Sequence, residues 1–449
     1  MYKTNLIKAL CLFLSVSILW ASCEKKNPNF QKEIADAEYL HRSMLELTSV
    51  IKHDLFPPMI ASRIYAYAHV AAYEALNANT EGYQSLAKQL NGLGEMPQPE
   101  AGKEYCFPLA SVKAYLKVGK KLIFSEDSIT AFENRIFKEM KMIGVPKDVY
   151  ERSIAYGDTV GGAIIKWSAK DNYAQTRSMP KYTVSQNNPA RWSPTAPDYA
   201  DALEPHWCKI RPMAIDSAAQ FKPAAATPFN SSKGSQFYKE AYEVYKSVAD
   251  STPERIATGR YWDDSPASTN NAGHFNFVVK KITPPGHWLH ITMYASRALK
   301  KDIYQVAEAY AKVAISELDA SISCWDEKYR SAVIRPETYI SKYIAPEWVP
   351  IIVTPPFPEY PSGHSTFSGA ACTVLTSLYG NNVAFTDSTE VQFGMTPRSF
   401  NSFDEAAKQA AISRFYAGIH YMPACDNGIK QGIDVGNFVL NKIKTKIMK

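Results

Sequence analysis

Residues 291–324 read ITMYASRALKKDIYQVAEAYAKVAISELDASISC, and this stretch decides the fold class. Alanine, tyrosine, valine and isoleucine recur in it at spacings of three and four residues, which is the period of an amphipathic α-helix. Residues 31–76, 128–166 and 235–247 show the same helical character, and strand-like alternation of useful length is lacking. We therefore expect an all-α protein with a helical bundle core.

Between residues 171 and 228 the helical pattern breaks up. This stretch is rich in Asn, Ser and Thr, and prolines punctuate it at positions 180, 189, 194, 197, 205, 212, 223 and 228. Such a composition predicts long ordered loops. Long loops in a compact protein usually cover a functional site, so we expect these loops to lie over one.

The composition is that of a folded globular protein. The chain has 449 residues, of which 46% are hydrophobic and 21% charged. Its net charge of +6 is modest for this length, and the only basic block is a short C-terminus at 442–449, which we interpret as a solvated helix end. We therefore expect no nucleic-acid partner. Residues 23–449 are expected to form a single large domain, and the oligomeric state stays open.

The N-terminus predicts export. Lys3 and Lys8 flank the start, an apolar run covers residues 9–20, and two small residues then stand directly before Cys23. This layout is typical of a secretory signal. A cysteine in this place resembles a bacterial lipoprotein signal, so residues 1–22 would be removed and Cys23 would carry a lipid anchor at a bacterial membrane, periplasmic or at the cell surface. A plain cleaved signal with an incidental cysteine is the alternative.

Three groups of polar residues in the last third of the chain carry the chemistry. The first is Lys328 and Arg335, which lie seven residues apart and project from one face if the preceding helix continues until Pro336 ends it. Two cations on one stripe near a helix end need an anionic partner. An exposed pair would by itself be an ordinary solvated face.

The second group is the tetrapeptide Pro361-Ser362-Gly363-His364, which leads from a proline-rich loop into a helical run at 365–379. The first N–H groups of a helix have no partner within it, and together with the helix dipole they form an anion site. Ser362 and His364 stand at this site. The alternative is that the serine only caps the helix and the histidine only flanks the cap.

The third group is Arg414 and His420, near the end of a helix that opens with Ser402 and Glu405 spaced as in a capping box. Six residues place the two side chains about 120° apart on an ideal helix. They converge only if the arginine reaches across or if the helix ends near Gly418.

In this order, Lys-x6-Arg-Pro, Pro-Ser-Gly-His and Ser-Arg-x5-His form a signature. It resembles that of the type 2 phosphatidic acid phosphatase superfamily, which includes the vanadium-dependent haloperoxidases. The haloperoxidase branch is the better match, because Trp325 and Phe357 stand at positions similar to the aromatic wall beside the vanadate in chloroperoxidase-type members. Residues 57–65 and 284–288 also look like bacterial haloperoxidase-like proteins. Lipid phosphatases of the superfamily carry several spanning helices, and nothing after residue 23 qualifies as one.

The resemblance implies an enzyme with a vanadate cofactor that oxidises halide with hydrogen peroxide. His420 would bond to the vanadium, and His364 would hydrogen-bond its apical oxygen and carry the proton. The residues implied to hold the equatorial oxygens are Lys328, Arg335, Ser362, Gly363 and Arg414. The two arginines can present forked donors to an oxyanion.

Two other functions stay open at this point. With a phosphate ester in the same pocket, His420 would be a nucleophile that forms a phosphohistidine, and His364 would protonate the leaving group. The protein would then be a phosphomonoesterase of the acid phosphatase type, and the signature does not separate this from the peroxidase. The third possibility is a non-catalytic lipoprotein that binds an oxyanion.

One position departs from the superfamily. An Asp usually follows the final histidine by four residues and orients its ring, whereas this chain has Ala424 there. Either Asp426 or a backbone carbonyl would then orient the ring. Asp263 and Asp264 are candidates for pairing with an arginine of the site, and His287 is a candidate for lining its entrance.

Overall fold

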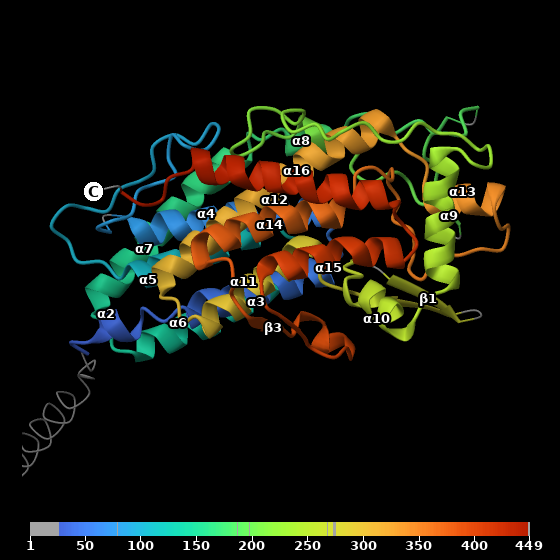
Figure 1. Ribbon diagram of the computed structural model, residues 1–449. Coiled ribbons are helices and arrows are strands. Elements are labelled where there is room, and N and C mark those ends of the chain that lie inside the picture. Colours follow the sequence, from blue (N-terminus) through green and yellow to red (C-terminus); the bar gives the residue numbers. More distant parts are fainter. Residues whose placement is uncertain are drawn as a thin grey trace, which may run out of the picture.

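Helices make up nearly all of the regular structure, which confirms the expected fold class (Figure 1). The computed structural model describes residues 27–447 except positions 79, 186, 197, 267 and 273–274. The helices are α2 (Phe30–Glu33), α3 (Glu38–His53), α4 (Pro58–Asn77), α5 (Phe107–Lys121), α6 (Glu126–Met142), α7 (Lys147–Ser168), α8 (Tyr173–Thr176), α9 (Gln236–Ala249), α10 (Pro253–Tyr261), α11 (Pro284–Ala298), α12 (Ile303–Ser331), α13 (Pro336–Tyr343), α14 (Gly363–Tyr379), α15 (Phe403–Tyr416) and α16 (Met422–Lys442).

Two short antiparallel hairpins are the exception to the helical pattern. Strand β1 (Ser268–Ala272) pairs with β2 (Phe275–Val279), and β3 (Phe385–Asp387) pairs with β4 (Arg398–Phe400). Two 3-10 turns are also present, η1 (Trp207–Lys209) and η2 (Thr389–Phe393). The sequence predicted no strands, because segments this short give too few alternations to recognise.

Helix α14 lies in the middle of the C-terminal group of helices and packs against α12, α15 and α16. Helix α12 also packs against α4. Helix α4 in turn packs against α5, and α5 packs against α7, so α12 joins two groups of helices (Figure 1). Their apolar faces form one continuous core that includes residues from Phe30 to Ile443. The predicted bundle core is confirmed.

The stretch at 291–324 proves to contain two helices. A turn at 299–302 separates α11 from α12: Lys300 there has a φ of 50°, and the Asp302 carboxylate caps α12 by accepting the N–H of Gln305 at 2.9 Å. The stretch at 128–166 is likewise divided where Gly144 has a φ of 88°. The apolar period continues across such short turns because both flanking helices face the same core, so the period alone does not reveal them.

Glycines allow α16 to approach α14 closely. A Cβ at Gly432 would lie 2.1 Å from the carbonyl oxygen of Thr366, and one at Gly428 would lie 2.7 Å from that of Ser362. Both are backbone atoms that cannot swing aside. The small residues of α16 therefore fix the position of the N-terminus of α14, where the Pro-Ser-Gly-His motif is.

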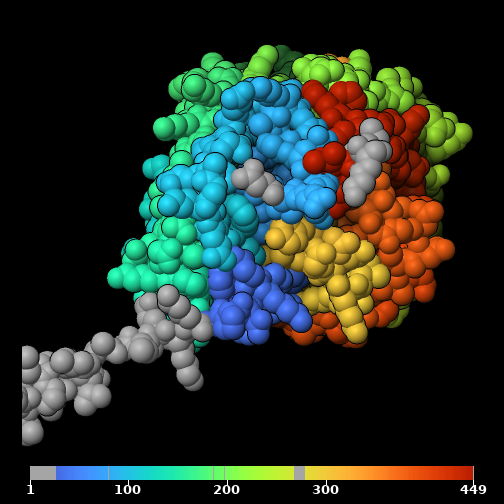
Figure 2. Space-filling model, turned by 90° about the vertical axis from the view of Figure 1, so that its left-hand side faces the viewer, coloured from blue at the N-terminus to red at the C-terminus, as the bar shows by residue number. Residues whose placement is uncertain are grey.

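The C-terminus packs against the segment that follows α4, as the red and light blue surfaces in Figure 2 show. The N–H of Gln84 donates to the carbonyl of Thr445 at 3.1 Å. Helix α16 ends at Lys442, and residues 443–447 after it are not helical. The expectation that the basic segment forms a helix end is therefore wrong for these residues. The expected signal peptide and Cys23 lie outside the described residues, and no helix within those residues is long and apolar enough to cross a membrane.

Candidate active site

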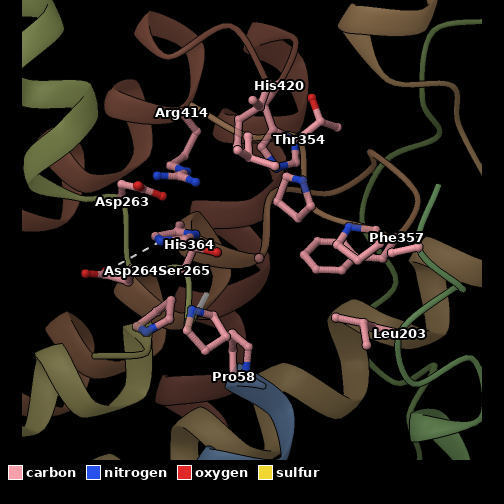
Figure 3. A pocket seen from close by; sticks show the side chains of 18 of the residues that line it. Pro58, Leu203, Asp263, Asp264, Ser265, Thr354, Phe357, His364, Arg414 and His420 are labelled. Atoms are coloured by element: carbon pink, nitrogen blue, oxygen red, sulfur yellow. Dashed lines mark ion pairs between the residues drawn. The ribbon is translucent and has the colours of Figure 1, made fainter. Parts of the chain in front are cut away.

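A cavity of about 270 Å³ lies where the start of α14, the end of α15 and three loops meet (Figure 3). Two of the loops contribute residues 263–266 and 353–357 to its wall. The third contributes residues from Thr195 to Leu203, which belong to the proline-rich stretch at 171–228. The prediction that this stretch covers a site is confirmed.

His420 lines the cavity and keeps one ring nitrogen unprotonated. Its Nδ1 donates to Oε1 of Glu359 at 2.7 Å, and the same oxygen accepts the backbone N–H of Tyr421 at 3.0 Å. The proton on Nδ1 leaves a lone pair on Nε2. Burial and the neighbouring cations lower the pKa of His420 well below its usual range, so Nε2 carries no proton at neutral pH and can accept from Nη1 of Arg335 at 3.2 Å.

Arg335 is held by backbone carbonyls beside that histidine. Its Nε donates to Phe357 and its Nη1 to Ile419, both at 2.9 Å, and Nη1 lies 3.2 Å from Nε2 of His420. Its Nη2 is buried without a partner. Burial lowers the pKa of Arg335 to about 10, which still leaves the guanidinium charged at neutral pH.

Lys328 lies behind the cavity wall. Its Nζ donates to the carbonyls of Pro358 and Glu359 at 3.0 Å and to that of Pro361 at 2.5 Å, so three acceptors match the three protons of the ammonium. Burial lowers the pKa of Lys328 to about 7. A direct contact with an oxyanion would require Lys328 to give up one of these bonds, whereas its charge acts from where it is.

The two cations come together by a route that differs from the predicted one. Helix α12 ends at Ser331, and Arg335 is the residue that precedes α13, so Pro336 begins a helix and does not end one. Lys328 and Arg335 therefore share no helical face. The residues between them form a turn in which Ala332 has a φ of 48°.

The N-terminus of α14 supplies Gly363 and His364 to the cavity wall. Ser362 is fully buried behind them, and its Oγ caps the helix by accepting the N–H of Ser365 at 3.4 Å. Ser362 therefore caps α14, and its role in holding the oxyanion stays a prediction. His364 does more than flank the cap, because its ring reaches the cavity and lies opposite Asp264 (Figure 3).

Arg414 lies in the last turn of α15, and the chain reverses at Gly418, where φ is 85°. This is one of the two conditions under which Arg414 and His420 were expected to converge, and both line the cavity. Nη1 of Arg414 donates to the carbonyl of Trp262 at 2.5 Å. Its Nε is buried without a partner.

The two aspartates at 263 and 264 line the cavity and their charges act on Arg414, but among the described residues neither forms a direct ion pair with a site arginine, so the predicted pairing is not found. Asp263 lies 3.2 Å from the ammonium of Lys281. Asp264 lies 3.5 Å from Nε2 of His364 and 2.9 Å from Nδ1 of His287. His287 is fully buried beneath Asp264, so it does not line the entrance as expected.

The orientation of the His420 ring also corrects a prediction. Asp426 is exposed near the start of α16, and the ring contacts Glu359. Glu359 is not among the residues predicted from the sequence, although it is the only acidic residue between Glu347 and Asp387 and stands three residues before Ser362. A lone carboxylate in an apolar, proline-rich loop was the available signal.

Trp325 and Phe357 form the predicted aromatic wall. Their ring centroids are 5.1 Å apart at an interplanar angle of 56°. The ring of Phe357 also lies 5.0 Å from the guanidinium of Arg335 and 5.1 Å from Nζ of Lys328, which is the range of cation–π attraction. The wall therefore stabilises the charges behind it while keeping one side of the cavity apolar.

The cavity is built for an anion. Within the described residues, Nη2 of Arg335 and Nε of Arg414 are buried donors without partners, and leaving such a donor unsatisfied costs about 1–3 kcal/mol. Lys328, with a pKa of about 7, adds a third positive charge once an anion in the cavity favours its protonated form, and an unprotonated histidine nitrogen stands beside them. This set fits an oxyanion whose central atom accepts a histidine lone pair, as vanadate does.

Fold and site together define a helical-bundle enzyme that holds an oxyanion between cations and a histidine. A family model described as "VCPO second helical-bundle domain" matches residues 308–449. The chain is similar to the crystal structure of a bacterial vanadium-dependent iodoperoxidase, with 46% identity and a TM-score of 0.87, over 92% of this chain and 98% of that one. It also has the fold of a bacterial vanadium-dependent chloroperoxidase, at 15% identity and a TM-score of 0.64, over 87% and 93% of the two chains. No curated protein matches.

The chain belongs to the vanadium-dependent haloperoxidase family. It is accordingly a vanadate-dependent enzyme that uses hydrogen peroxide to oxidise halide.

Proposed function

We propose that this protein oxidises iodide in preference to bromide and chloride, at a vanadate bound to Nε2 of His420. The lone pair on Nε2, fixed by the hydrogen bond from Nδ1 to Glu359, is the observation that carries the vanadate assignment. The similarity to a bacterial iodoperoxidase over nearly the whole of both chains supports iodide as the halide.

When bound, vanadate supplies a Lewis acid that activates hydrogen peroxide without changing its own oxidation state. The free donors of Arg335 and Arg414 and the first N–H groups of α14 would hold its oxygens. Gly363 lines the cavity without a side chain between its backbone and the anion. Lys328 would add positive charge from behind the wall.

His364 is the group that would move the proton. Halide, hydrogen peroxide and one proton give hypohalous acid and water, so each turnover consumes a proton at the site. Burial and the charge of Arg414 lower the pKa of His364 to about 4, while Asp264 opposes them. An anion in the cavity would add negative charge and favour the protonated ring.

The test is a halide series with matched variants. The chain without residues 1–23 is reconstituted with orthovanadate, and peroxide-dependent oxidation of iodide, bromide and chloride is measured along with vanadate-free hydrolysis of a phosphomonoester. Wild type should oxidise iodide with the highest kcat/KM, and His420→Ala should abolish this. At about 100 times its dissociation constant, vanadate should stabilise wild type by roughly 2.7 kcal/mol and His420→Ala not at all.

Two outcomes would contradict the proposal. Phosphomonoester hydrolysis without halide oxidation, inhibited by vanadate, would establish the phosphohistidine alternative. Equal or higher efficiency with bromide would remove the iodide preference while leaving the vanadate site in place.

We also propose that the protein is exported and lipid-anchored through Cys23. The short apolar run and the small residues before Cys23 support this. Expression of the full chain with a labelled fatty acid should give a labelled membrane-bound protein, and Cys23→Ser should lose the label. An unlabelled, released wild-type protein would favour a plain cleaved signal.

A further inference from the structure

A chain of buried hydrogen bonds leads away from His364. Behind Asp264, Nδ1 of His287 lies 2.9 Å from Oδ1 of that carboxylate, and Nε2 of His287 lies 2.7 Å from Oδ2 of Asp387. All three side chains are buried, from the loop after α10, the first turn of α11 and the end of β3. Elements far apart in the sequence therefore converge on one imidazole.

Asp387 can only accept a hydrogen bond from His287 and cannot donate one. Its Oδ1 accepts the N–H and the hydroxyl of Thr389, at 2.9 and 2.6 Å, and its Oδ2 accepts the hydroxyl of Tyr261 at 2.8 Å. Donors on both oxygens fix this group as an ionised carboxylate. Nε2 of His287 must therefore be the one that carries the proton in the bond to Asp387.

The other nitrogen of His287 also faces a carboxylate. Although burial opposes a charge on the ring, Asp264 and Asp387 raise the pKa of His287 well above its usual range. The ring stacks on the indole of Trp262, with centroids 4.5 Å apart and an angle of 17°, which suits a cation. His287 is therefore an imidazolium that donates from both nitrogens.

We propose that His287 is a positioning residue, a permanent imidazolium held between Asp264 and Asp387 that fixes the Asp264 carboxylate opposite His364. This rests on the haloperoxidase function proposed above, in which His364 moves the proton. Within the described residues, Oδ2 of Asp264 has no hydrogen-bond partner, since Nε2 of His364 lies 3.5 Å away, whereas Oδ1 is bound by His287 at 2.9 Å. Without His287, the buried Asp264 would lose its strongest partner and would take up a proton or move away.

A metal ion is the competing explanation for this cluster. Ligand atoms of Asp264, His287 and Glu390 lie within 4.8 Å of one another, and both carboxylate oxygens of Glu390 are buried without partners. However, both nitrogens of His287 are already engaged by carboxylates, so neither offers a lone pair. Burial, with Asp264 next, raises the pKa of Glu390 to about 8, which makes it a neutral acid at pH 7.

The titratable groups around His287 are few in the described part of the chain. Those that act on it or on Glu390 are Asp264, Asp387, Tyr261, His290, Lys281 and His364. His290 has neither ring nitrogen bonded, and burial lowers its pKa to about 3, so it stays neutral. Asp264 and Asp387 are thus the partners that decide the charge of His287.

The first test needs no vanadate and no activity. Nitrogen-15 NMR of histidine-labelled, vanadate-free protein should show one ring with both nitrogens protonated from pH 5 to pH 9, and His287→Gln should lose that signal. The nine histidines make the assignment tractable, and Asp387→Asn serves for assignment if His287→Gln does not fold. A His287 ring with one bare nitrogen at pH 7, or one equivalent of metal that is lost in Glu390→Gln, would overturn the proposal.

The second test is a double-mutant cycle on kcat for halide oxidation. Asp264→Asn and His287→Gln should each lower kcat about 10- to 100-fold, and the double variant should be no worse than Asp264→Asn alone. Glu390→Gln, an equally buried change beside the cluster, should leave kcat unchanged. If the two losses of kcat multiply in the double variant, or if His287→Gln leaves kcat unchanged, His287 does not act through Asp264. An inactive wild-type enzyme would contradict the proposed function. The NMR result would still decide the charge of His287.

Discussion

A single carboxylate decides which nitrogen of His420 can bind a cofactor. Oε1 of Glu359 already accepts the N–H of Tyr421, and Nε2 of His420 lies 3.2 Å from the donor Nη1 of Arg335, so the ring proton is on Nδ1 and Nε2 carries none. Burial raises the pKa of Glu359 to about 7, although Arg335 and Lys328 oppose this. The tautomer of the catalytic ring is therefore set by one residue in the proline-rich loop.

Glu359→Gln should weaken vanadate binding about 10- to 100-fold, because the amide can donate to Nδ1 and so favour the tautomer with its proton on Nε2. Titration of the vanadate-free protein by calorimetry measures this directly. Glu347→Gln, an exposed change in the preceding loop, is the control and should bind as wild type does. Unchanged affinity in Glu359→Gln would mean that the contact with Arg335 suffices to orient the ring.

A second residue, Glu317, affects the stability of the core and not the chemistry of the site. Glu317 is fully buried in α12, both its oxygens lack partners, and burial raises its pKa well above the usual value of 4.5. The folded protein keeps this proton at pH 7 while the unfolded chain releases it. Glu317 therefore does not change the free energy of unfolding at a pH below its pKa in the unfolded chain. As the pH rises above that pKa, the free energy of unfolding falls.

Glu317→Gln should consequently be more stable than wild type at pH 7.5 by roughly 1–3 kcal/mol, and the difference should shrink towards pH 4.5. Urea unfolding at the two pH values gives the comparison. An equal difference at both would show that Glu317 does not titrate on unfolding.

At the scale of elements, the site depends on how closely two helices approach. Helix α14 presents its N-terminus to the cavity, and the glycines of α16 determine where that terminus lies. The pair is the most intimate helix contact of the C-terminal group, since a Cβ at Gly432 would fall inside the backbone of α14. Packing and catalysis are coupled here through a backbone, not through a side chain.

Gly432→Ala should therefore destabilise the protein by about 2 kcal/mol or more, because the new methyl meets the carbonyl of Thr366. Vanadate affinity should fall as well, since the start of α14 must shift. Gly162→Ala on α7, where a Cβ would meet only the end of Lys117 at 3.7 Å, is the matched control. Loss of stability with unchanged vanadate affinity would show that the packing of α16 does not set the position of the α14 N-terminus at the site.

At the scale of the whole molecule, α12 belongs to both groups of helices. It packs against α4 on one side and against α14 and α16 on the other, and one apolar core continues through all of them. The chain end is also tied to the segment after α4 by backbone hydrogen bonds. If the chain forms a single domain, as expected from the sequence, the whole protein should unfold cooperatively.

Differential scanning calorimetry of the chain without residues 1–23 should show one unfolding transition whose calorimetric and van't Hoff enthalpies agree. Vanadate should move the whole transition to higher temperature. Two resolved transitions, only one of which responds to vanadate, would divide the chain into two domains near residue 308, where the matched family model begins.

The sequence by itself determined the fold class and most of the site. Apolar residues at helical spacing specify helices locally, and the motifs around Lys328, His364 and His420 specify which side chains carry the chemistry. Only the tertiary structure decided what holds those side chains in place. Glu359 and His287 reach their partners from 61 and 23 residues away, and such separations leave no periodic trace in a sequence. The position of the Arg335 side chain similarly depends on a turn and not on the helix that a spacing of seven residues had indicated. Once a helix has ended, the path of the chain decides where a side chain points, and the spacing in the sequence no longer does.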